Sequence, residues 1–129
     1  MTEPSTTTEH YHDPDDRHFA RNLRRSAPDA FTAFLEFDTQ ALRSPTKTIP
    51  RKYTELMALA VALTTQCVYC IEGHTAAAQA EGATEAEIAE TVFTAAALRA
   101  GGAMAHGMMA MKLYHRAAAT AAAQGEADR

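Results

Sequence analysis

The sequence contains no dense block of lysine or arginine and no long apolar run. Its 12 lysines and arginines are outnumbered by 16 aspartates and glutamates, which gives a formal net charge of −4. Nucleic-acid phosphates and anionic lipids are bound by basic faces, so neither nucleic acid nor a membrane surface is an expected partner. The longest mainly apolar run, residues 56–63, is far shorter than the roughly 20 residues of a membrane-spanning helix.

Cysteine is also scarce, with two residues in a chain of 129. A chain of this length with 47% hydrophobic residues can bury one core without a disulfide framework. The first residues lack the basic start and the apolar segment of a secretory signal. We therefore expect a soluble cytoplasmic protein with one domain.

Composition divides the chain into three parts. Residues 1–14 are mostly polar and bury too little apolar surface to offset the entropy of ordering, so they are expected to form a flexible N-terminal arm. Residues 15–123 are rich in alanine and have helical spacing without sustained two-residue alternation, which predicts a single all-α domain. Residues 124–129 form a short polar tail that should fray.

The all-α domain is predicted to be a bundle of about six helices. Gly101 and Gly102 are expected to separate the last two, because paired glycines commonly end a helix. Phe31 and Phe34 lie on one stripe of the second helix and are predicted core anchors. The predicted helices cover approximately 15–25, 27–43, 50–63, 67–80, 85–100 and 103–123.

Two predicted helix starts have the spacing of a capping box. Thr84 and Glu87 form the standard T-x-x-E pattern before the fifth helix, and Ser26 with Asp29 forms a variant of it before the second. In such a box each side chain accepts a hydrogen bond from the backbone of the other residue. We therefore expect both boxes to form.

The two cysteines, Cys67 and Cys70, are three residues apart near the start of the fourth helix, and His74 follows one turn later. At helical spacing the three side chains share one otherwise apolar face. A helix N-terminus lowers the pKa of a thiol, and the thiolate is the nucleophile. This pattern favours redox chemistry over a buried pair of small core residues, and the spacing allows a Cys67–Cys70 disulfide in the oxidised protein.

Glu55 lies on the apolar stripe of the preceding helix. The two helices are separated by a short connection and should be antiparallel, so the face with His74 and the cysteines is the partner within reach of a buried carboxylate. Burial is expected to raise the pKa of Glu55 toward neutrality, as a general base requires. Glu55 would then orient the imidazole or relay a proton.

Other uses of a C-x-x-C pair fit less well. Haem attachment requires histidine directly after the second cysteine, where this chain has Ile71, and a thioredoxin domain requires strands around the motif. A structural zinc site needs four ligands, and Cys67, Cys70 and His74 supply only three. A catalytic zinc ion bound by Cys67, Cys70 and His74, with Glu55 as base, stays open, although neither a metal nor a cofactor is expected.

The pattern E-x11-C-x-x-C-x3-H, from Glu55 to His74, resembles the active-site signature of the alkylhydroperoxidase D-like group in the carboxymuconolactone decarboxylase superfamily. The resemblance covers about residues 26–110. It implies an all-helical thiol peroxidase in which Cys70 would be peroxidatic and Cys67 resolving, with Glu55 and His74 moving protons. Tyr69 matches a further position that assists.

The same resemblance implies partners. Members of this group assemble as trimers or hexamers, so a homo-oligomer is expected. The implied substrate is a peroxide, and the implied reductant is a dithiol or a lipoylated protein.

Alternatives remain for two residues and for the activity. Tyr69 falls opposite the thiols on the helix, so packing or a subunit contact explains it equally well. His106 is either a polar residue at a helix start or a group beside the thiols. The protein would otherwise be a decarboxylase-like enzyme, although that branch lacks the C-x-x-C pair, or a non-enzymatic redox-sensing helical module whose cysteines oxidise without turnover.

Overall fold

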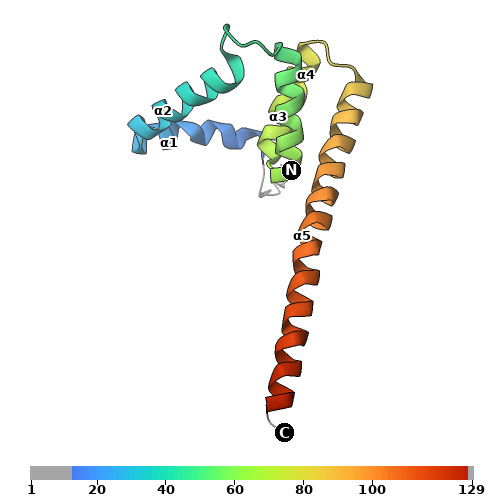
Figure 1. The fold of residues 1–129 in the computed structure, drawn as a ribbon. Helices are drawn as coiled ribbons and strands as arrows, with labels where there is room; N and C mark the ends of the chain where they lie inside the picture. The colour runs from blue at the N-terminus through green and yellow to red at the C-terminus, as the bar shows by residue number, and fades with distance from the viewer. Residues whose placement is uncertain (1–12, 128–129) are drawn as a thin grey trace, which may run out of the picture.

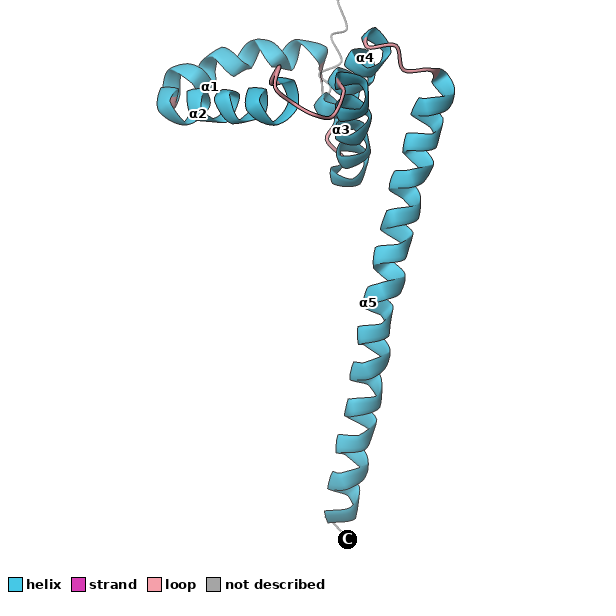
Figure 2. Ribbon diagram, turned by 45° about the horizontal axis from the view of Figure 1, so that its top comes forward, coloured by secondary structure: helices cyan, strands magenta, loops and turns pink. Residues whose placement is uncertain are grey.

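The computed structural model describes residues 13–127 and contains only helices and connecting loops in that range (Figures 1 and 2). The predicted all-α class is confirmed. None of the helices in this range is long and apolar enough to cross a membrane. The elements are the 3-10 helix η1 (Pro14–Phe19), α1 (Ala20–Ser26), α2 (Pro28–Asp38), the π-helical turn η2 (Thr39–Arg43), α3 (Arg51–Thr65), α4 (Val68–Ala80) and α5 (Glu85–Ala127).

Helices α3 and α4 form a hairpin at the centre of the molecule (Figure 1). Gln66 adopts the left-handed conformation, with φ 58°, and so ends α3 and reverses the chain within two residues. The apolar residues buried between helices are Leu59 and Ala62 of α3, Ala78 of α4 and Ala95 of α5. Most of these are alanines, whose small side chains allow the helices to lie close together.

The first half of α5 packs beside α3. Lys52 Nζ lies 2.7 Å from Glu87 Oε1, and Arg99 Nη1 donates to the Thr64 carbonyl at 2.9 Å. Both pairs join residues 35 positions apart, so the two helices run in the same direction. The hydrogen bond from Lys52 also lowers the pKa of Glu87, and the same bond raises the pKa of Lys52.

The second half of α5 differs from the prediction. The helix is continuous through Gly101 and Gly102 and extends to Ala127, so the predicted break is wrong. A glycine costs about 1 kcal/mol relative to alanine in a helix, which is too little to end a helix flanked by strong helix formers. Because α3 ends at Thr65, this half of α5 extends past the body of the molecule (Figure 1).

Helices α1 and α2 pack against each other and extend sideways from the hairpin (Figures 1 and 2). Phe34 is 62% exposed and Phe31 is half-buried, so the prediction that they anchor the core is wrong for Phe34 in the single chain. The first predicted helix is divided, with η1 preceding α1. These helices expose apolar side chains that no other residue between 13 and 127 covers.

The two predicted capping boxes have different outcomes. At the start of α5, Glu87 N–H donates to Thr84 Oγ1 at 3.2 Å and Thr84 N–H donates to Glu87 Oε2 at 2.8 Å, which confirms that box. At the start of α2 the Ser26–Asp29 box is wrong, because Ala27 is the cap and makes no side-chain bond. Pro28 occupies the first helical position there, where its missing N–H costs nothing.

The described residues include only the inner ends of the predicted arm and of the predicted tail. Residues 1–12 of the arm lie outside the described residues. Asp13 caps η1 and forms a capping box with Asp16, so the last two residues of the predicted arm have a defined backbone. At the other end, α5 continues through residues 124–127 of the predicted tail.

Candidate active site

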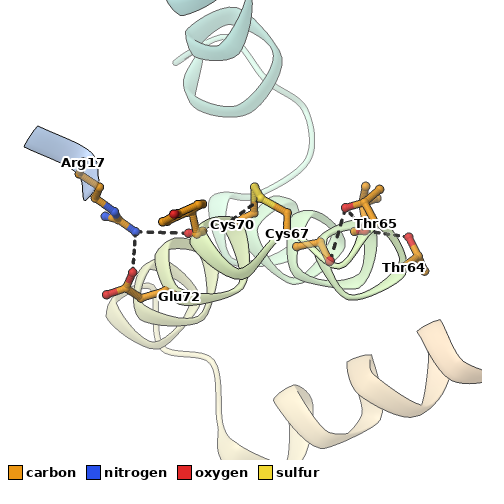
Figure 3. The surroundings of a disulfide bond; sticks show 9 residues. Arg17, Thr64, Thr65, Cys67, Cys70 and Glu72 are labelled. Atoms are coloured by element: carbon orange, nitrogen blue, oxygen red, sulfur yellow. Dashed lines mark hydrogen bonds and ion pairs between the residues drawn. A yellow bond between two sulfur atoms is a disulfide. The ribbon is translucent and has the colours of Figure 1, made fainter. Parts of the chain in front are cut away.

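The predicted disulfide joins Cys67 and Cys70 at the start of α4, with 5.2 Å between their Cα atoms (Figure 3). Cys67 has extended backbone and is the N-cap of α4, and its sulfur accepts a hydrogen bond from Cys70 N–H at 3.3 Å. The chain reversal at Gln66 places this cap at the end of the hairpin. Both cysteines are half-buried, so the sulfurs are neither sealed in the core nor fully exposed.

His74 lies one turn after Cys70 on the same helix. Side chains four residues apart are neighbours on a helix surface, so the imidazole and the second sulfur share a face, as predicted. The His74 side chain is 17% exposed. It is thus largely sheltered from water.

Glu55 of α3 binds His74 across the hairpin. The His74 Nδ1 atom lies 2.7 Å from Glu55 Oε2, and the Glu55 side chain is 1% exposed. The predicted pairing of the carboxylate with the imidazole is therefore present. An ionised carboxylate accepts hydrogen bonds only, so Nδ1 carries a proton and Nε2 is the ring nitrogen left for other chemistry.

The other oxygen of the same carboxylate accepts a hydrogen bond from Arg51, which was not among the predicted site residues. Arg51 Nε donates to Glu55 Oε1 at 2.5 Å from one turn earlier on α3. The four-residue spacing of an arginine and a glutamate was the available signal. Both oxygens of Glu55 are thus occupied by donors from two helices.

The expected direction of the Glu55 pKa shift is wrong. Burial raises the pKa of Glu55, but the hydrogen bonds and charges of His74 and Arg51 lower it, and the net result is a pKa below the usual value. Glu55 is consequently an ionised carboxylate at neutral pH. It can orient His74 and balance a positive imidazolium, whereas it is a poor general base.

Tyr69 is bound to residues of η1. Its hydroxyl donates to Asp16 Oδ2 at 2.5 Å, and its carbonyl accepts from Arg17 Nη2 at 3.2 Å. Arg17 Nη2 also lies 3.1 Å from Glu72 Oε2 (Figure 3). These contacts attach η1 to the first turns of α4, which supports the packing interpretation of Tyr69.

His106 is not brought to the disulfide within one chain. Its Nδ1 atom donates to the Gly102 carbonyl of its own helix at 2.9 Å, and the residue is exposed. It lies in the half of α5 that extends past the end of α3. Between residues 13 and 127, no group of three or more His, Cys, Asp or Glu side chains is arranged to hold a metal ion.

Comparison with known proteins gives a consistent result. The sequence model of the carboxymuconolactone decarboxylase family matches residues 28–113. "Uncharacterized protein 4 in cox locus" of Paracoccus denitrificans is 44% identical over 88 residues, which are 67% of this chain and 73% of that protein.

A solved structure is also similar. It is the crystal structure of apo-lpg0406, a carboxymuconolactone decarboxylase family protein from Legionella pneumophila, with a TM-score of 0.59 and 27% identity. The match covers 65% of this chain and 73% of the Legionella chain.

Proposed function

The chain belongs to the carboxymuconolactone decarboxylase family, and we propose that within it the protein is a thiol-dependent peroxidase that reduces alkyl hydroperoxides. The observation that carries the proposal is the Cys67–Cys70 disulfide placed one turn from His74. A buried carboxylate, Glu55, holds this histidine at 2.7 Å. A disulfide and an oriented base are the two components that a dithiol cycle requires.

The cycle begins with the reduced protein. The Cys70 thiolate attacks the terminal oxygen of a hydroperoxide, the O–O bond breaks, and the products are a Cys70 sulfenic acid and an alkoxide that takes a proton to become an alcohol. The Cys67 thiolate then attacks the Cys70 sulfur, forms the disulfide and releases hydroxide, which leaves as water after protonation. Two electrons and two protons from an external dithiol restore both thiols.

His74 handles the protons of this cycle. Its Nδ1–H is bound to Glu55, so the neutral ring has Nε2 free to accept the proton of the Cys70 thiol. The imidazolium that forms is balanced by the ionised Glu55. The same proton then passes to the alkoxide, so that the histidine ends each peroxide reduction in its starting state.

The reductant and the assembly belong to the same proposal. A small dithiol or a lipoylated protein would attack the disulfide at the hairpin end, where the sulfurs are half-buried. We propose that the working form is a homo-oligomer, because the described part of the chain leaves the apolar side chains of α5 beyond α3 exposed: Met104 is 67% and Met108 is 63% exposed. A cytoplasmic location would supply the reductant.

Steady-state consumption of cumene hydroperoxide with dihydrolipoamide as reductant tests the activity. The expected result is turnover of many peroxide equivalents per chain, lost in Cys70→Ser, with the native protein without reductant as the matched control. Consumption that stops after one equivalent despite excess reductant would identify a redox sensor instead. Conversion of a carboxymuconolactone by a variant lacking both cysteines would place the protein with the decarboxylases.

A further inference from the structure

Arg51 reaches the buried carboxylate from the side opposite His74. Its Nε donates to Glu55 Oε1 at 2.5 Å, while Glu55 Oε2 lies 2.7 Å from His74 Nδ1. The Arg51 side chain is 36% exposed and the Glu55 side chain is 1% exposed. The guanidinium is therefore the group through which a buried negative charge at the site is compensated.

Charged residues on the neighbouring elements are paired with one another. On α5, Glu87 is bound to Lys52, and before α3, Arg43 forms an ion pair with Asp38. The groups that act on the Glu55 carboxylate are therefore Arg51 from its own helix and His74 from α4. Of these two, only the arginine is charged at every pH at which the protein would work.

We propose that Arg51 is a positioning residue that keeps Glu55 ionised and so determines which ring nitrogen of His74 carries the proton. An ionised Glu55 only accepts, so the His74 proton resides on Nδ1 and Nε2 is free as a base. A protonated Glu55 would donate to Nδ1 and place the ring proton on Nε2. In that tautomer the histidine has no free nitrogen with which to activate a thiol.

Loss of Arg51 should reverse this arrangement. Burial opposes the charged form of a carboxylate, and in the absence of the guanidinium only the hydrogen bond and the charge of His74 would oppose burial. The assignment of the tautomer stands on the hydrogen bonds of the hairpin together with the ionised state of Glu55, and it does not depend on the activity. Its catalytic consequence rests on the proposed peroxidase function.

The direct test is the tautomer of His74, measured from the two ring-nitrogen signals by two-bond proton–nitrogen NMR across pH 5–9 in the oxidised protein. In the unaltered chain and in Arg51→Lys, Nε2 is expected to be the unprotonated nitrogen of the neutral ring. In Arg51→Met, the neutral ring is expected to carry its proton on Nε2. Lys52→Met is the matched control, since it removes the adjacent charge without touching Glu55, and it should give the unaltered pattern.

An unchanged tautomer in Arg51→Met would overturn the inference, and so would a Lys52→Met protein with the same change. If Arg51→Met does not fold, Arg51→Gln keeps a hydrogen-bond donor without the charge and is expected to shift the tautomer in the same direction. A carboxyl carbon signal showing Glu55 protonated at pH 7 in the unaltered chain would also overturn it.

Kinetics separate this inference from the proposed function. The rate of sulfenic acid formation at pH 7 should fall about tenfold or more in Arg51→Met, with recovery in Arg51→Lys and no change in Lys52→Met. A tautomer change in a protein that never reacts with peroxide would support the role of Arg51 and contradict the peroxidase. Normal peroxide reduction with an unchanged tautomer would support the peroxidase and contradict the role of Arg51.

Discussion

The sulfur of Cys67 lies 3.3 Å from the backbone nitrogen of Cys70, so the first cysteine caps the helix on which the second one lies. A side chain at this position accepts from an N–H group that has no partner within the helix. We expect the sulfur of Cys67 to keep this capping position when the disulfide is reduced. The two cysteines are therefore not equivalent in their surroundings.

The first prediction concerns the roles of these thiols. Cys67→Ser should accumulate a Cys70 sulfenic acid after one equivalent of peroxide, because the thiol that would condense with it is absent. Dimedone labelling followed by mass spectrometry detects the product. Cys70→Ser should lose peroxide reactivity, and labelling of Cys67 in that variant at an undiminished rate would exchange the two assignments.

The capping role of Cys67 gives a prediction about stability. Under reducing conditions Cys67→Ala should lower the free energy of unfolding by about 1 kcal/mol, because the N-terminal amide loses its acceptor. Cys67→Ser should not, because serine is a strong cap. Urea titration of the two variants checks this, and an equal loss in both would show that the sulfur is not a cap in the reduced protein.

The pKa of Glu55 gives a pH dependence. Its pKa is lower in the folded chain than in the unfolded chain, so the ionised group stabilises the fold above its ordinary pKa of about 4.3. This stabilisation is lost as the pH falls through the folded-state pKa. Glu55→Gln should therefore cost about 2 kcal/mol at neutral pH and progressively less in acid.

Unfolding experiments on both proteins from pH 7 down to pH 3 check this prediction. The same Glu55→Gln protein should react more slowly with peroxide while both of its thiols remain titratable. A constant difference in stability across the whole range would contradict an ionised Glu55.

The continuity of α5 predicts the effect of filling its glycines. Gly101→Ala and Gly102→Ala should each raise the free energy of unfolding by up to about 1 kcal/mol, because an added Cβ at either position meets nothing within 4 Å. Thermal unfolding measures the change. A loss of stability would instead indicate a turn or a close contact at these glycines.

The exposed face of α5 predicts self-association. Multi-angle light scattering should give a mass several times the 13.9 kDa of one chain, and Met108→Glu should shift it toward the single chain by placing a charge in the contact. Arg116→Glu, which changes a charge farther along the same helix, is the control for a nonspecific charge effect. A monomer at working concentration would contradict the proposed assembly.

Local patterns predicted the centre of the molecule well. The Thr84–Glu87 box, the chain reversal before the cysteines and the pairing of Glu55 with His74 all follow from spacing within one or two helices. Each depends on residues close in sequence, where helical geometry alone decides which side chains meet.

The errors concern balances between opposing effects. Two glycines predict a break, but their cost is smaller than the propensity of the surrounding α5 residues. Burial of Glu55 predicts a raised pKa, but Arg51 and His74 outweigh it. A helical stripe identifies Phe34 as apolar-facing without showing whether its cover comes from the same chain.

The α3–α4 hairpin supplies the carboxylate of Glu55, its partners Arg51 and His74, and both cysteines. All contacts within it join residues close along the chain, and closing a short loop has a small entropic cost. The carboxylate, the imidazole and the sulfurs can therefore come together early in folding, before α5 or a second chain has docked. Amides of this hairpin should thus gain protection from hydrogen exchange first when the unfolded protein is diluted from denaturant.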